Sequence, residues 1–326
     1  MHDVQDRQLA LNRWLSQNLA TPYKIDTIKS GAGTRRYFRV ITQDKNLVVM
    51  DGYQDKKLKN FIELSAAFKK LSVETPEVLQ AEMELGFLLL TDFGNQSFSD
   101  ALNLANVNNL YATAMETLLK IQKYPATALF PLQNFDTKTF RLKMDWFLEY
   151  YLQQMLKLNI NMPLQNEMRR LFDYLIASLM DQPITCVHYD YHCKNLMLLA
   201  DNKPGVLDFQ DAVWGPITFD LMSLVRDCYV DWPNSMVLAW IQQFHRAVLQ
   251  SATVCTEDPT LWQKWCDYSS AVRHIKCIGQ FAHFHITGYS SEYLMYIPRV
   301  VRYLKEVAVV YPEMASLAKL LEAIRP

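Results

Sequence analysis

The sequence predicts an α+β chain of two lobes, a small β-rich N-terminal lobe and a mainly helical C-terminal lobe. Short runs with strand-like alternation come first along the chain, and long patterns with helical spacing follow. An apolar run at residues 86–90 separates the two parts and indicates a buried strand that leads into a hinge at about residues 91–95. We therefore expect one lobe over residues 1–92 and the other over residues 93–326.

Each lobe contains elements whose apolar positions recur at a regular spacing. In the first lobe the pattern predicts helices over residues 5–19 and 57–71 and strands over residues 23–29, 37–42, 46–50, 77–80 and 87–90. In the second lobe it predicts helices over about residues 97–123, 138–158, 164–181, 218–229, 235–252, 258–280, 291–308 and 312–324. One segment interrupts these helices, a hairpin with strands at 195–199 and 206–208 around a turn of Asp, Asn, Lys, Pro and Gly.

Composition argues against several classes of protein. With 326 residues and 50% hydrophobic content, the chain can bury a large core. A formal net charge of −1 and the lack of a Lys/Arg-rich run argue against a nucleic-acid partner. No apolar stretch is long enough to span a membrane, and six cysteines without a C-x-x-C pair are typical of reduced thiols. We therefore expect a cytoplasmic protein that binds neither nucleic acid nor membrane.

The segment from His188 to Asp208 carries the clearest chemical signal. Asp190 precedes Asn195 by five residues and Asp208 follows the hairpin, in the order H-x-D-x-x-x-x-N … D-F that is typical of kinase-type phosphoryl transfer. The first carboxylate can meet an acceptor hydroxyl, while the amide oxygen and the second carboxylate are hard ligands that suit Mg²⁺. Isolated Asp and Asn residues usually cap helices or make turns, but five specified positions in the required order favour kinase-like chemistry.

A second Asp-Phe pair lies in the predicted hinge. Residues 92–94 spell Asp-Phe-Gly, the protein-kinase metal motif, but they stand far ahead of Asp190 in the chain. In that architecture the metal-binding Asp follows the catalytic loop. We therefore assign Asp208 to the metal and Asp92 to the hinge. The hinge residues that we expect to line the nucleotide site are Leu90, Thr91 and Asp92.

Two glycines lie close together between the first two predicted strands. The chain has only 9 glycines. Gly31 and Gly33 have a single residue between them and stand just before Thr34, Arg35 and Arg36. Glycine there allows backbone N–H groups to approach phosphate oxygens, and an arginine adds positive charge. Gly-x-Gly is also common in ordinary hairpin turns, but its place ahead of the catalytic segment favours a phosphate-binding loop.

These residues together resemble the aminoglycoside phosphotransferase-like kinases. Residues 188–195 and 207–212 are similar to the catalytic and metal-binding segments of that family. The likeness narrows to the bacterial anomeric kinases that phosphorylate N-acetylmuramate and N-acetylglucosamine in peptidoglycan recycling, and it covers nearly the whole chain. The segments that carry this narrower likeness are residues 34–39, 48–51, 86–94, 204–220, 232–233, 273–282, 293–294 and 298–299.

The resemblance implies a bilobal protein-kinase-like fold and an ATP- and Mg²⁺-dependent kinase acting on the anomeric (C1) hydroxyl of N-acetylmuramate, N-acetylglucosamine or both. By this resemblance Asp190 is the catalytic carboxylate, Asn195 and Asp208 bind Mg²⁺, and His188 and Asp220 support the catalytic loop. Asp220 can also be interpreted as an ordinary residue in the first turn of a helix, and this interpretation is compatible with the supporting role. The implied partner is a small-molecule sugar, and we expect a monomer.

The sequence defines the sugar-binding residues less sharply. We expect Asp211, Trp214 and Arg273 to contact the substrate. Arg273 would pair with the lactyl carboxylate of N-acetylmuramate, and a structural ion pair explains this residue equally well. Aromatic side chains can stack on a sugar ring or belong to the core, and the candidates are Trp146, Trp214, Tyr229 and Trp232.

One position departs from the family pattern. Met50 stands at the end of the third strand, where most of these kinases carry a phosphate-binding lysine, so we expect Arg36 or Arg39 to balance the phosphate charge. Two alternatives stay open. One is a kinase for an aminoglycoside or a choline-type amine, which the lack of a dense acidic run disfavours. The other is a nucleotide-binding pseudokinase, for which Met50 is the only support.

Overall fold

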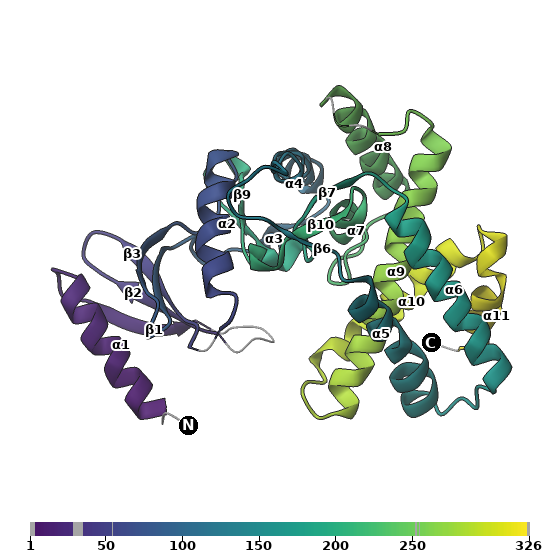
Figure 1. Cartoon of the computed structure of the whole chain (residues 1–326), viewed down its shortest axis with the longest axis horizontal. Helices are drawn as coiled ribbons and strands as arrows, with labels where there is room; N and C mark the ends of the chain where they lie inside the picture. The colour runs from purple at the N-terminus through teal and green to yellow at the C-terminus, as the bar shows by residue number, and fades with distance from the viewer. Residues whose placement is uncertain (1–3, 29–34, 54, 252, 254, 325–326) are drawn as a thin grey trace.

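The computed structural model describes residues 4–28, 35–53, 55–251, 253 and 255–324, which form a small and a larger lobe (Figure 1). The small lobe, at the left of the figure, is built on a five-stranded antiparallel sheet of order β1-β2-β3-β5-β4. The strands are β1 (Lys24–Ile28), β2 (Arg36–Ile41), β3 (Asn46–Asp51), β4 (Val78–Glu82) and β5 (Phe87–Thr91). All five strands that the sequence predicts for the small lobe are therefore present, with ends that differ by at most two residues.

Helices cover both faces of this sheet. They are α1 (Val4–Asn18) and α2 (Leu58–Lys70). Alternation along β3 explains the two cores, since successive side chains of a strand point to opposite faces. Leu47 and Val49 pack in the cluster that contains Leu15 of α1, whereas Met50 packs in the cluster that contains Phe61 of α2. The second cluster continues into the larger lobe, so the two lobes share part of one core.

The larger lobe is mainly helical, as the sequence predicts. Its helices are α3 (Phe98–Ala101), α4 (Val107–Gln122), α5 (Thr137–Trp146), α6 (Met162–Met180), α7 (Phe219–Val225), α8 (Asn234–Gln250), α9 (Pro259–Ile286), α10 (Ile297–Ala308) and α11 (Ala315–Ala323). The α5 helix continues as a π-helix, η1 (Phe147–Met155), and both pack along α9. No helix in the described part of the chain has both the length and the apolar character needed to cross a membrane.

Several predicted elements differ from the structure. The helix expected over residues 97–123 is two helices, α3 and α4, and the helix expected over 218–229 ends at Val225. Three short strands that the sequence patterns missed, β6 (Gln133–Asn134), β7 (Ile184–Val187) and β10 (Val213–Pro216), form a sheet of order β6-β10-β7. The predicted hairpin is present as β8 (Leu196–Leu198) and β9 (Pro204–Val206), and its return strand therefore lies two residues earlier than expected.

The β8–β9 hairpin is fixed to the connection between the lobes. The Phe93 ring lies so close to Gly205 that a Cβ at this glycine would stand 2.6 Å from the ring. The Leu198 N–H donates to the Gln96 carbonyl at 2.8 Å, and the Val206 N–H donates to the Glu74 carbonyl at 2.7 Å. The segment that follows β5 thus contacts the hairpin between Asn195 and Asp208.

Candidate active site

Asp190 lies in the loop after β7, and a buried carboxylate holds this loop in place. Asp220, in the first turn of α7, accepts hydrogen bonds from the backbone N–H groups of His188 at 2.5 Å and of Tyr189 at 3.0 Å. Tyr189 has a φ of +86°, a conformation that costs a non-glycine residue energy and persists only when its surroundings fix it. Burial raises the pKa of Asp220 to about 6. This brace determines the direction in which Asp190 leaves the loop.

The loop is also bonded to the hairpin that follows it. The His188 ring contacts the Leu207 carbonyl through Nε2 at 2.8 Å. The Asn195 side-chain nitrogen donates to the Asp190 carbonyl at 3.0 Å, and the Leu207 N–H donates to the Asn195 carbonyl at 2.9 Å. Since its nitrogen is occupied, the Asn195 side chain is oriented with its Oδ1 available as a ligand.

Asp208 stands just beyond the return strand, on the same end of the hairpin as Asn195. It has a φ of +60°, in the left-handed region, and its side chain is 50% exposed. Gln210 donates to Asp208 Oδ1 at 2.6 Å. An oriented amide oxygen and an exposed carboxylate on neighbouring backbone form the kind of partial oxygen site that Mg²⁺ completes with water and phosphate. The residues present therefore fit a magnesium ion.

Positive side chains surround Asp190. Burial alone would raise the pKa of Asp190. The charges of Lys276, His192 and Arg273 outweigh that effect and lower this pKa below the ordinary aspartate value. Lys276 lies on α9 with its Nζ 5.8 Å from the centre of the Tyr189 ring. Lys276 is not among the predicted site residues, because a lysine within a helical pattern carries no local signal of function.

Three arginines of the small lobe lie in or just before β2, and the structure gives each a carboxylate partner. Arg36 donates to the buried Asp51 at 2.5 Å, and Arg39 donates to Asp92 at 2.6 and 3.0 Å. Arg35 donates to Asp55 at 2.6 Å, and its other end lies 3.8 Å from Asp208 Oδ1. Arg35, rather than Arg36 or Arg39, therefore lies beside the predicted metal ligand.

The remaining nucleotide-binding predictions fall at the hinge and in the glycine loop. Leu90 is buried at the end of β5, the Thr91 hydroxyl accepts a hydrogen bond from the Glu77 N–H at 2.9 Å, and Asp92 is paired with Arg39. These residues lie at the connection between the lobes, and their nucleotide contacts stay a prediction. Gly31, Gly33 and Thr34 lie outside the described residues.

Two of the three predicted sugar contacts lie near the catalytic loop. Asp211 forms an ion pair with Lys57, which precedes α2, so this contact joins the two lobes. Arg273 lies on α9 and is only 5% exposed, and its guanidinium donates to the Met222 carbonyl at 3.3 Å. Its charge acts on Asp190 from the interior of the lobe.

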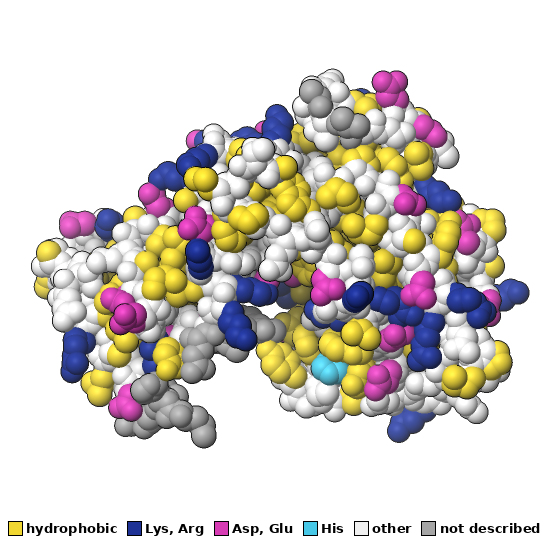
Figure 2. Space-filling view, viewed as in Figure 1, with side chains coloured by type: hydrophobic (Ala, Val, Ile, Leu, Met, Phe, Trp, Pro, Cys, Tyr) yellow, Lys and Arg dark blue, Asp and Glu magenta, His cyan; other side chains and the backbone are white. Residues whose placement is uncertain are grey.

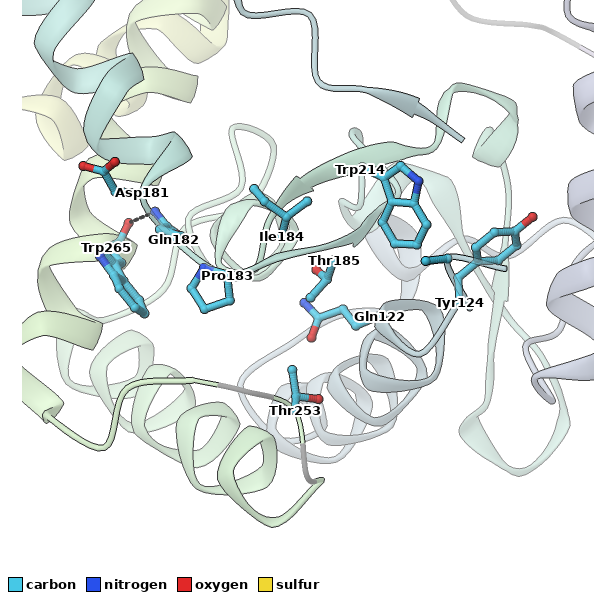
Figure 3. A pocket seen from close by; sticks show the side chains of 11 residues that line it. Gln122, Tyr124, Asp181, Gln182, Pro183, Ile184, Thr185, Trp214, Thr253 and Trp265 are labelled. Carbon is cyan, nitrogen blue, oxygen red and sulfur yellow. Dashed lines mark hydrogen bonds between the residues drawn. The ribbon is translucent and has the colours of Figure 1, made fainter. Parts of the chain in front are cut away.

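Trp214 does not join this group. On β10 it pairs with Cys186, while its neighbour Val213 pairs with Val187 and packs with Tyr189 on the opposite face of the sheet. The indole instead faces a surface cavity of about 690 Å³ that also contains Tyr124 (Figure 3). The other aromatic candidates have partners of their own. Trp146 stacks on His283, Tyr229 contacts the Lys194 ammonium, and Trp232 donates to the Tyr111 hydroxyl.

Comparison with known proteins agrees with this arrangement. Residues 24–253 match the family model described as the phosphotransferase enzyme family. A kinase named for N-acetylmuramate and N-acetylglucosamine from Pseudomonas putida is 32% identical over 99% of this chain and 98% of its own length. The enzyme of the same name from Pseudomonas aeruginosa is also 32% identical, over 93% of this chain and 89% of its own. The crystal structure of an ADP-bound aminoglycoside phosphotransferase superposes with a TM-score of 0.61 at 15% identity, covering 90% of this chain and 96% of the other.

Proposed function

Because the chain belongs to the phosphotransferase enzyme family, we propose that it is an ATP- and Mg²⁺-dependent kinase that phosphorylates the anomeric hydroxyl of an N-acetylated amino sugar. The observation that carries this proposal is the match to two kinases of N-acetylmuramate and N-acetylglucosamine over most of each chain. We propose the same two sugars as substrates here. The proposed setting is peptidoglycan recycling by a cytoplasmic monomer.

In this proposal Asp190 orients the sugar hydroxyl and accepts its proton. The low pKa of Asp190 keeps the carboxylate ionised at neutral pH. A hemiacetal hydroxyl is more acidic than an ordinary alcohol, so a weak base is sufficient. The brace from Asp220 and the hydrogen bond from Asn195 hold the loop, and such positioning is a large part of catalysis by kinases.

Asn195 and Asp208 would hold Mg²⁺ through Oδ1 and the exposed carboxylate. When bound, the ion neutralises negative charge on the phosphates during transfer. Gln210 keeps one Asp208 oxygen oriented by its hydrogen bond. The predicted loop with Gly31 and Gly33 would contact the phosphates from the small lobe.

The surroundings of Asp190 weigh against the two alternatives. Aminoglycosides and choline are cations and require acidic side chains around the acceptor hydroxyl, whereas Lys276 and Arg273 place positive charge there. A pseudokinase would explain Met50, but it would not explain why Asp190, Asn195 and Asp208 all keep positions suited to phosphoryl transfer.

The proposed function is tested by incubating the purified protein with ATP, Mg²⁺ and a panel of amino sugars, with ADP release as the readout. We expect turnover with N-acetylmuramate and N-acetylglucosamine and a product that mild acid hydrolyses, because a sugar 1-phosphate is a glycosyl phosphate. The methyl glycoside of N-acetylglucosamine is the control, since its C1 oxygen is blocked. Phosphorylation of that glycoside, or an acid-stable product from the free sugar, would exclude transfer to C1.

A further inference from the structure

Two lysines beside the catalytic loop form no direct ion pair with a described residue. Lys276 lies on α9 and Lys143 on α5, and both side chains are half-buried. Among the residues that the structure describes, no carboxylate oxygen lies within 4.0 Å of either ammonium nitrogen. The charge of Asp190 acts on both lysines without a contact of this kind. A half-buried charge that lacks a direct partner is costly, so the pair can receive an anion.

The packing of the two helices brings these lysines together. The α5 helix and its continuation η1 run alongside α9, and Gly279 permits close approach because a Cβ there would lie 2.4 Å from the Phe147 nitrogen. Trp146, the residue before Phe147, stacks on His283, one turn after Gly279, at 4.3 Å between ring centres. Residues three and four apart share a helix face. Lys143 on α5 and Lys276 on α9 each lie one turn before the Phe147–Gly279 contact, on the faces that meet there.

The same two helices reach the residue that precedes Asp190. Phe140, one turn before Lys143, lies 6.3 Å from Tyr189 between ring centres, and Lys276 Nζ lies 5.8 Å from the centre of that ring. Burial and the charge of Lys276 lower the pKa of Lys143, and the next contribution comes from the charge of Asp190. The lysine pair therefore lies beside Tyr189 and close to the catalytic carboxylate.

Neighbouring cations are less available for a ligand. Lys57 is already paired with Asp211, and Arg273 is buried and bonded to the Met222 carbonyl. Figure 2 shows the surface hollowed between the two lobes, with Lys and Arg side chains on its rim. Unlike Lys57, Lys143 and Lys276 form no ion pair within 4.0 Å among the described residues, so an anionic group could bind both ammonium groups directly.

We propose that Lys143 and Lys276 bind the carboxylate of the acceptor sugar and make the enzyme selective for N-acetylmuramate over N-acetylglucosamine. This inference rests on the proposed function. The two sugars have the same C1 hydroxyl and the same N-acetyl group, and they differ in the lactyl ether that carries the carboxylate of N-acetylmuramate. An ammonium pair that is anchored beside Asp190 can distinguish them by charge. Arg273, the candidate from sequence, then acts on Asp190 rather than on the sugar.

The test compares kcat/KM for the two sugars at saturating ATP in Lys143→Met and Lys276→Met. Loss of a charged hydrogen bond lowers binding by about 10- to 100-fold, so we expect this loss for N-acetylmuramate and a much smaller one for N-acetylglucosamine. Lys276→Arg should restore part of the selectivity because it keeps the charge. The matched control is Lys138→Met, an exposed lysine on the same α5 helix, which should leave the ratio of the two kcat/KM values unchanged.

Each outcome separates the possible roles. An equal loss for both sugars would overturn the inference, because it would assign the lysines to the charge environment of Asp190, to ATP or to the fold. An unchanged ratio in both variants would overturn it as well. ADP binding and thermal unfolding of each variant are measured in parallel, and the two independent positions keep the test valid if one variant does not fold. If the unmodified enzyme phosphorylates neither sugar, the proposed function itself fails.

Discussion

Replacement of Asp190 by asparagine tests the assignment of the catalytic base. The change keeps the size of the side chain and leaves the backbone contacts of the loop in place, because those contacts use the carbonyl of Asp190 and the carboxylate of Asp220. Asparagine cannot accept the proton of the sugar hydroxyl. We therefore expect the fold and the affinity for ADP to be preserved while phosphoryl transfer is lost.

The environment of Asp190 sets the size of this loss. A general base contributes about 10²- to 10⁴-fold, and it contributes most when its pKa is near the working pH. Lys276, His192 and Arg273 outweigh burial and keep the pKa of Asp190 below the ordinary value, so its proton affinity is low. We expect kcat to fall by at least about 10²-fold, near the lower end of that range.

Two measurements check this reasoning. Steady-state kinetics of Asp190→Asn is compared with Asp201→Asn, the same substitution at an exposed position in the turn of the neighbouring hairpin, which should turn over like the unmodified enzyme. In the unmodified enzyme, protonation of Asp190 should reduce kcat/KM only as the pH falls below about 4, since an ordinary aspartate titrates near 3.9. Near-native turnover by Asp190→Asn would remove this carboxylate from the mechanism.

Three further predictions follow from the same contacts. Asp208→Ala should abolish Mg²⁺-dependent turnover, and Asp92→Ala should leave most of it. The reverse result in a kinetic assay would show that Asp92, rather than Asp208, binds the metal. Asp220→Ala should lower kcat and cost about 1–3 kcal/mol of unfolding free energy in urea, because two buried N–H groups lose their acceptor. The pKa of Asp220 is about 6 in the folded protein, above the unfolded value of about 3.9. Ionisation of Asp220 therefore makes the fold less stable as the pH rises from about 3.9 to about 6. This pH dependence of stability should vanish in Asp220→Ala. Arg35→Met should raise KM for ATP about tenfold. Arg36→Met should mainly lower the melting temperature, because it leaves the buried Asp51 with one partner fewer. Equal KM values for the two variants would refute this distinction.

The sequence could predict the elements whose patterns are local. Strands such as β3 show the period of two that places Val49 and Met50 on opposite faces. The order of Asp190, Asn195 and Asp208 along the chain reflects a hairpin that brings the predicted metal ligands together. The strands β7 and β10 escaped prediction because each is four residues long and exists through its pairing with the other. The run Trp214-Gly215-Pro216 shows no alternation, and Gly and Pro are depleted in strands.

The site residues divide in the same way. Spacing along the chain identifies Asp190 and its neighbours, but no spacing reveals that Trp214 points away from the catalytic loop or that Arg273 is buried against the Met222 carbonyl. Lys143 and Lys276 are separated by more than a hundred residues, and their proximity depends on the register of α5 against α9. Contacts that depend on helix packing leave no motif in a single sequence.

Met50 shows how a departure from the family pattern is compensated. Its side chain is fully buried, and the α2 residues that pack in the same cluster are apolar, Leu58 and Phe61 among them. A lysine at this position would have to place an ammonium in that cluster, at the cost of burying an unpaired charge. We expect the positive charge to come instead from just before β2, where Asp55 holds the Arg35 guanidinium beside Asp208. Because that guanidinium lies 3.8 Å from Asp208 Oδ1, we expect Arg35 to contact the phosphates of a nucleotide whose magnesium ion Asp208 would hold.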